Sequence, residues 1–131
     1  MLQGVDPATH VRIDVFRAYG LEMKRIVPVT VVGLRLRMVS LEDLIARHAR
    51  LNLDLLEGNC VAPKFARDFL RMIDLVAPDA LEGIWQEHRK PQQPKSFSQT
   101  IMQLRKAIAT RTDLFGLSYL FHRCARGLQA M

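Results

Sequence analysis

The sequence predicts an α+β fold in which a short N-terminal β unit precedes four or five helices. Apolar and polar residues alternate with the period of a strand at the start of the chain, and from residue 40 onward apolar residues recur with the period of a helix. The chain has 131 residues, of which 49% are hydrophobic, enough for one domain with one core. We therefore expect a single domain over 1–131: a β unit at 1–39, helices at 40–90, a proline-rich linker at 91–95 and C-terminal helices at 96–131.

Three runs of residues predict the antiparallel β unit. Residues 11–17 alternate apolar and polar side chains, and Asp14 falls on the polar side. Residues 26–32 are almost entirely β-branched, which favours a strand. After a turn at Gly33, residues 34–38 alternate leucine or methionine with arginine. We expect the last two runs to form a hairpin that lies beside the first strand.

The helices are predicted from their start and stop signals. Ser40 precedes a helical apolar pattern and two acidic residues, as an N-cap does, and Gly58 ends that pattern. Pro63 and Pro78 begin the next two helices, since proline suits the first turn. Ser96 is the N-cap of a helix after the linker, and a weaker last helix is expected over 114–129.

Composition and charge exclude several classes of protein. No stretch approaches the roughly 18 apolar residues that span a bilayer, and the N-terminus lacks a secretory signal, so we expect a cytoplasmic protein with no membrane contact. The two cysteines form no C-x-x-C pair, which favours reduced thiols over a zinc site. The net charge of +6 favours anionic partners such as a nucleotide or nucleic acid, although no block of five like charges marks a nucleic-acid arm.

Several motifs, taken in order, resemble a known family. They are the strand at 10–16, Gly33, residues 37–46 with their Ser-Leu-Glu-Asp-Leu-Ile helix start, and residues 64–68. In this order they are similar to the distal half of bacterial nucleotidyltransferase-fold proteins of the polymerase-beta-like superfamily, of the minimal or toxin–antitoxin type. The segment 85–91, with Phe97 and residues 111–114, also resembles the C-terminal extension of uncharacterised members, so the resemblance covers roughly residues 10–114.

The resemblance implies a catalytic site that this chain does not complete. The family binds nucleotide phosphates with a Gly-Ser pair and holds two magnesium ions with Asp-x-Asp or Asp-x-Glu and a third carboxylate. Asp14 matches the third carboxylate, as a catalytic and metal-binding candidate, but the sequence contains no Gly-Ser pair, no Asp-x-Asp and no Asp-x-Glu. One carboxylate cannot position two metal ions, so magnesium is expected only if the missing carboxylates are supplied.

Four basic residues are candidates for binding phosphate. Lys64 and Arg67 lie in the motif at 64–68, with ordinary surface ion pairs as the alternative, since Lys64 and Asp68 are four residues apart. Arg35 and Arg37 share one face of a predicted strand, and a solvated strand face is the alternative.

Two functional hypotheses follow. The first is a nucleotidyltransferase-like protein that is catalytically incomplete on its own, either as the distal part of a longer protein or as a non-catalytic relative. The alternative is a basic, mainly helical interaction module that binds a partner protein or nucleic acid. In the first case the strand at 11–17 lacks its usual neighbours and presents an open edge, so we expect a homodimer through this strand.

Overall fold

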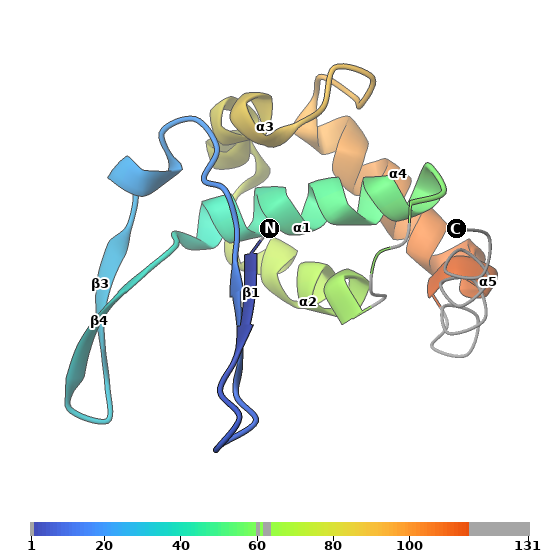
Figure 1. Ribbon diagram of the computed structural model, residues 1–131. Helices are drawn as coiled ribbons and strands as arrows, with labels where there is room; N and C mark the ends of the chain where they lie inside the picture. The colour runs from blue at the N-terminus through green and yellow to red at the C-terminus, as the bar shows by residue number, and fades with distance from the viewer. Residues whose placement is uncertain (1, 60, 62–63, 116–131) are drawn as a thin grey trace.

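The computed structural model confirms the α+β fold, with two β hairpins followed by a bundle of helices (Figure 1). It describes residues 2–59, 61 and 64–115, and for residues 13 and 14 the backbone alone. Both cysteines lie outside the described residues.

Four strands form two separate antiparallel sheets. β1 (Leu2–Val5) pairs with β2 (Arg12–Val15), and β3 (Val27–Val31) pairs with β4 (Leu34–Met38). The predicted hairpin of the last two strands is confirmed. Its expected place beside the first strand is wrong, because β2 pairs with β1, a strand that the sequence did not predict, and no pairing joins the two sheets within the described residues.

The turn of the second hairpin is tight and carries an unusual residue. Val32 and Gly33 connect β3 to β4, and both have positive φ angles, of 49° and 74°. A two-residue loop with positive φ at both positions matches the twist of the flanking strands. Glycine adopts this conformation readily, but a β-branched residue does not, so Val32 is strained.

The helices begin largely where the sequence placed them. The side-chain oxygens of Ser40 and Ser96 accept hydrogen bonds from the backbone N–H of Asp43 (3.1 Å) and Gln99 (3.3 Å), which confirms both N-caps. The last predicted helix is described only as far as residue 115, and the rest of it lies outside the described residues. The helical elements are η1 (Glu22–Lys24), α1 (Leu41–Leu56), α2 (Lys64–Met72), η2 (Ile73–Leu75), η3 (Pro78–Leu81), α3 (Glu82–His88), α4 (Phe97–Thr110) and α5 (Thr112–Phe115).

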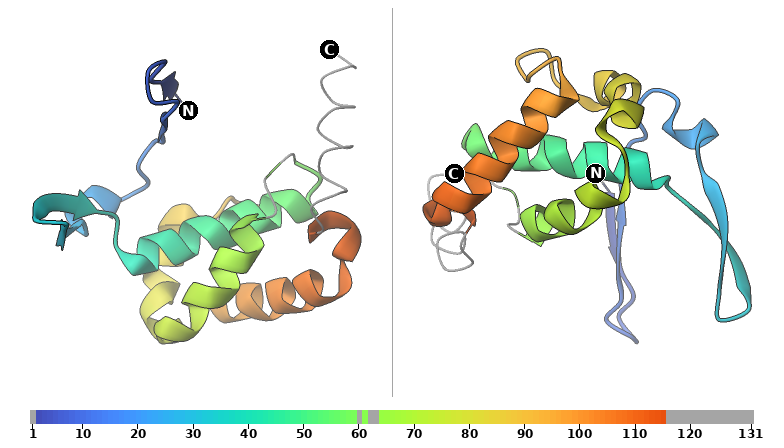
Figure 2. Two further views of the ribbon diagram at one scale, coloured as in Figure 1. Left: turned by 90° about the horizontal axis from the view of Figure 1, so that it is seen from below. Right: turned by 180° about the vertical axis from the view of Figure 1, so that it is seen from behind.

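The core lies inside the helical part of the chain. α1 runs through the middle of the bundle, with α2, α3 and α4 packed around it (Figure 2). Trp85 is fully buried, and its Nε1 donates a hydrogen bond to the carbonyl of Pro94 (2.8 Å). Gln93 is also buried and donates a hydrogen bond from Nε2 to Asp54 (3.3 Å), so the linker at 91–95 contacts α1 at this residue. Both hairpins stand off this body (Figures 1 and 2).

Candidate functional site

Three buried polar side chains from distant parts of the chain meet where the hairpins join the bundle. Glu22 belongs to η1, Asp43 to the first turn of α1 and His88 to the end of α3. Their exposed fractions are 1%, 0% and 1%, and their potential ligand atoms lie within 4.8 Å of one another. Buried ionisable groups of this kind are costly unless they are paired, so their partners decide what the group can do.

Asp43 is the centre of this group. Arg25 donates to its carboxylate from Nε (2.8 Å) and Nη2 (2.7 Å), and the hydroxyl of Ser40 (2.6 Å) and Nε2 of His88 (2.9 Å) also lie within hydrogen-bond distance. Burial alone would raise the pKa of Asp43, but the hydrogen bonds from Arg25, Ser40 and His88 outweigh it and hold the pKa well below its usual range. Asp43 is therefore an ionised, fully satisfied acceptor.

Glu22 and the nearby Glu87 are also paired with arginines. Nη2 of Arg47 donates to both carboxylate oxygens of Glu22, at 2.6 and 2.8 Å. Arg25 also donates to Glu87, at 3.1 and 2.7 Å, and this bond is the main cause of the lowered pKa of Glu87. The Glu22–Arg47 pair lies beside the network of Arg25, Asp43, Glu87 and His88, and we call these six residues the clamp.

The clamp fits a structural role better than a metal site. A metal ion bound by Glu22 and Asp43 would have to displace Arg47 from Glu22 and Arg25 from Asp43, and Arg25 also pairs with Glu87. A metal ion on Nε2 of His88 would also break the hydrogen bond between this atom and Asp43, at 2.9 Å. The clamp instead ties the segment between β2 and β3 to α1 and α3.

Tyr19 extends the same attachment. Its backbone N–H donates to Glu22 (2.9 Å), and its ring lies 4.3 Å from the guanidinium of Arg50 and 5.5 Å from the ring of His88. A guanidinium over an aromatic face is attracted by the ring. This ring therefore packs the same segment against α1 and α3.

The structure does not bring the predicted site residues together. Asp14 lies on β2 opposite Gln3, whereas the other candidates lie on elements that stand apart from β2 (Figures 1 and 2). These candidates are Arg35 and Arg37 on β4 and Lys64 and Arg67 on α2, all of them exposed.

The expected surface ion pair of Lys64 also takes a different form. Within the described residues, the carboxylate of Asp68 lies 3.9 Å from Nε2 of His48, and the ammonium of Lys64 lies over the ring of Phe65. His48 is buried, with Nδ1 2.8 Å from the carbonyl of Leu44. Burial lowers the pKa of His48.

The residues of the clamp were missed by the sequence analysis, although two signals were present. Asp43 is one of the two acidic residues that follow Ser40, and His88 follows Leu81, Ile84 and Trp85 at helical spacing. A histidine on an apolar stripe and an acid in the first turn after an N-cap are both candidates for burial. The sequence offers no spacing that links them to Arg25.

A second feature is the exposed apolar surface of the N-terminal 38 residues. Of the sixteen large hydrophobic side chains that are exposed within the described part of the chain, thirteen lie here and three, Leu70, Leu75 and Met102, lie in the bundle. Scattered exposed apolar residues are ordinary, but a concentration of this kind marks an interaction surface. The thirteen residues are Leu2, Val5, Val11, Val15, Phe16, Leu21, Met23, Val27, Val31, Val32, Leu34, Leu36 and Met38.

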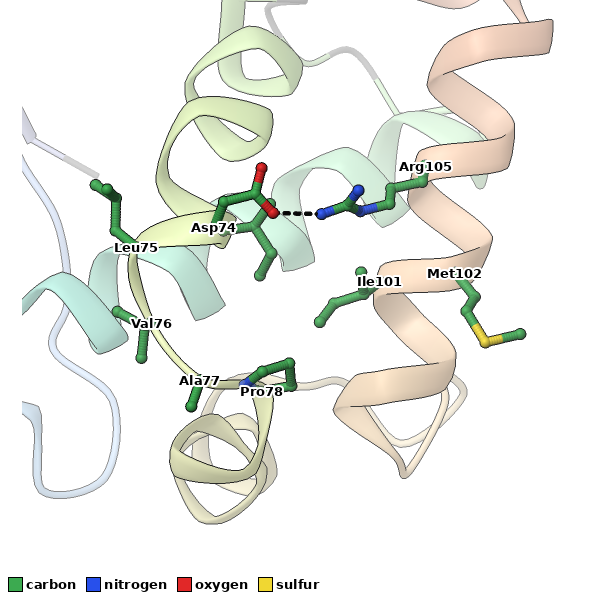
Figure 3. A pocket seen from close by; sticks show the side chains of 9 residues that line it. Asp74, Leu75, Val76, Ala77, Pro78, Ile101, Met102 and Arg105 are labelled. Atoms are coloured by element: carbon green, nitrogen blue, oxygen red, sulfur yellow. Dashed lines mark hydrogen bonds and ion pairs between the residues drawn. The ribbon is translucent and has the colours of Figure 1, made fainter.

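A pocket of about 610 Å³ lies between α4 and the connection from η2 to η3 (Figure 3). An ion pair between Asp74 and Arg105 (2.6 Å) crosses it, and Leu75 and Met102 line it with exposed side chains. Both charged groups are already paired with each other. The pocket therefore offers no unpaired charge that would orient a ligand.

Comparison with known proteins gives no match to a family model, to a curated protein or to a solved structure. Among the described residues, no helix has the length and apolar character needed to cross a membrane.

Proposed function

We propose that the chain is an assembly module whose two β hairpins bind the strands of another polypeptide. The observation that carries this proposal is the concentration of exposed apolar side chains on the hairpins. It supports the interaction-module hypothesis, with a protein rather than a nucleic acid as the partner, because the surface is apolar rather than a basic stripe.

The energetics of the hairpins favour a bound state. A two-stranded hairpin that packs against nothing is marginally stable in water. Val15, Phe16, Val31 and Leu34 are 53%, 54%, 47% and 65% exposed. Because full burial of such a side chain contributes about 1.5–3 kcal/mol, covering the exposed half of six of the thirteen exposed side chains would contribute roughly 6 kcal/mol. Added strands would also pair the open edges of both sheets.

The clamp presents the hairpins in a fixed position. It holds the segment between β2 and β3 against α1 and α3, so the end of one hairpin and the start of the other are attached to the bundle. A surface that is held before binding loses less conformational entropy when a partner arrives. A strained or mobile attachment would weaken the same contacts.

The nucleotidyltransferase hypothesis stays a prediction, and one observation is compatible with it. β2, which carries Asp14, has an open outer edge within the described residues, where strands with the missing carboxylates could pair. Such a protein would bind a nucleoside triphosphate with magnesium only after this assembly. Magnesium-dependent binding by the isolated chain, lost in Asp14→Asn, would contradict the expected incompleteness.

Site-specific photo-cross-linking in cells that produce the full chain tests the assembly proposal. A photoreactive residue in place of Val31 on β3 should give intermolecular protein adducts, and the same residue in place of the exposed Gln103 on α4 should not. No adduct at Val31, or equal adducts at both positions, would refute the proposal. An adduct at Val31 that nuclease removes would instead favour the nucleic-acid alternative.

A further inference from the structure

The outer edge of β2 has a sequence that complements itself. Residues 11–15 read Val-Arg-Ile-Asp-Val, and an antiparallel copy of this segment reads Val-Asp-Ile-Arg-Val. When two such segments are aligned on Ile13, valine lies opposite valine, arginine opposite aspartate and isoleucine opposite isoleucine. Opposite charges and β-branched residues in directly opposed positions stabilise a pair of strands.

The backbone of the hairpin decides which residues face this edge. The backbone N–H of Asp6 donates to the carbonyl of Val11 (2.9 Å), so Val11 turns its carbonyl toward the strand that precedes it. Because backbone groups alternate in direction along a strand, Ile13 and Val15 turn theirs toward β1. The N–H and C=O groups of Arg12 and Asp14 therefore point to the outer edge, which pairs with no other strand within the described residues.

Three antiparallel registers with a second copy bring Arg12 and Asp14 opposite one another or opposite themselves. Outward-facing residues must lie opposite outward-facing residues, so Arg12 can face Arg12, Asp14 can face Asp14, or Arg12 can face Asp14. The first two registers place like charges opposite each other, which is destabilising. The third, centred on Ile13, forms two Arg12–Asp14 pairs and opposes Val11 to Val15 twice.

We propose that the partner of β2 is a second copy of this chain, paired in the register centred on Ile13. The inference rests on the proposed function and names the partner at one of the two hairpins. The product is a four-stranded antiparallel sheet in the order β1–β2–β2–β1, with a two-fold axis at Ile13. Val11 and Val15, which are 54% and 53% exposed, gain neighbours from the second copy.

Charge reversal within β2 tests both the partner and the register. Arg12→Asp and Asp14→Arg should each weaken the dimer about tenfold or more in sedimentation equilibrium, because each places like charges opposite each other twice. The double variant Arg12→Asp/Asp14→Arg should restore the dimer to within about threefold of the unmodified chain. An equimolar mixture of the two single variants should form a heterodimer, since every pair is then opposite in charge again. Arg35→Asp on the other hairpin is the matched control and should leave the dimer unchanged.

The outcomes separate this inference from the proposed function. A chain that stays monomeric up to about 1 mM, single variants that dimerise normally, or a mixture that fails to recover the dimer would each overturn the inference. In any of these cases a cross-linked adduct at Val31 with the mass of a different protein would leave the proposed function standing. Helical circular dichroism should be the same in all variants, because β2 lies outside the core.

Discussion

Replacing Asp43 by asparagine tests the clamp at its centre. The side chain keeps its shape but loses the charge that Arg25, Ser40 and His88 all face. Removing one member of a buried ion pair costs about 3–5 kcal/mol, because the other charge is left uncompensated. Arg25 is 24% exposed and keeps Glu87 as a second partner, so we expect the lower end of this range, about 3 kcal/mol.

Urea unfolding followed by circular dichroism measures this loss in the full chain. The matched control is Asp74→Asn, which removes a carboxylate whose ion pair with Arg105 is exposed on both sides, at 73% and 51%. Exposed pairs contribute about 0–1 kcal/mol, so the control should change stability by less than 1 kcal/mol. If Asp43→Asn also costs less than 1 kcal/mol, the clamp does not hold the hairpins to the bundle.

The pH dependence of stability gives a second measure of the same group. The pKa of Asp43 is lower in the folded chain than its ordinary value of 3.8, so its contribution is complete above about pH 4 and is lost as the pH falls through the folded value. Glu87 acts in the same direction, because its pKa is also lowered. The unmodified chain should therefore lose stability as the pH falls from 5 to 2, and Asp43→Asn should lose less over the same interval.

Three further substitutions have expected outcomes. Gly20→Ala should lower the free energy of unfolding by about 1–3 kcal/mol, because Gly20 has a φ of +50° and an added Cβ would meet the carboxylate of Glu87. Gly4→Ala is the control: its added Cβ meets open space, so the free energy of unfolding should change little. Val32→Asn should slow amide hydrogen exchange in the second hairpin about fivefold, since asparagine accepts positive φ more readily; unchanged exchange would mean that the turn is not strained. Glu82→Ala should lower the free energy of unfolding in urea by about 1 kcal/mol, because the carboxylate of Glu82 accepts hydrogen bonds from the backbone N–H groups of Phe97 and Ser98 at the start of α4. An unchanged free energy of unfolding would mean that this cap is not formed in solution.

Local chemistry explains the parts of the fold that were predictable. A serine N-cap acts through a hydrogen bond to a backbone group three residues away, so Ser40 and Ser96 could be recognised from their neighbours. The alternation in residues 34–38 likewise depends only on adjacent side chains. β1 carries no such pattern. Leu2–Val5 becomes a strand through its pairing with β2, which the local sequence does not indicate.

The clamp was not predictable, because its contacts are distant in the sequence. Arg25 is 18 residues from Asp43 and 62 residues from Glu87, and the three meet only where the segment between β2 and β3 contacts α1 and α3. The predicted phosphate-binding residues failed to converge for the same reason. Arg37 and Arg67 each satisfy a local pattern, but their elements stand apart in the structure (Figure 1).

Amide hydrogen exchange on the full chain, compared at micromolar and near-millimolar protein concentration, measures most directly whether the outer edge of β2 is a self-assembly surface. The amides of Arg12 and Asp14, on the open edge of β2, should exchange at least tenfold more slowly at the higher concentration. The amides in the middle of α4, such as that of Leu104 in the core, should exchange equally at both concentrations. Exchange of Arg12 and Asp14 that does not depend on concentration would contradict self-assembly through this edge.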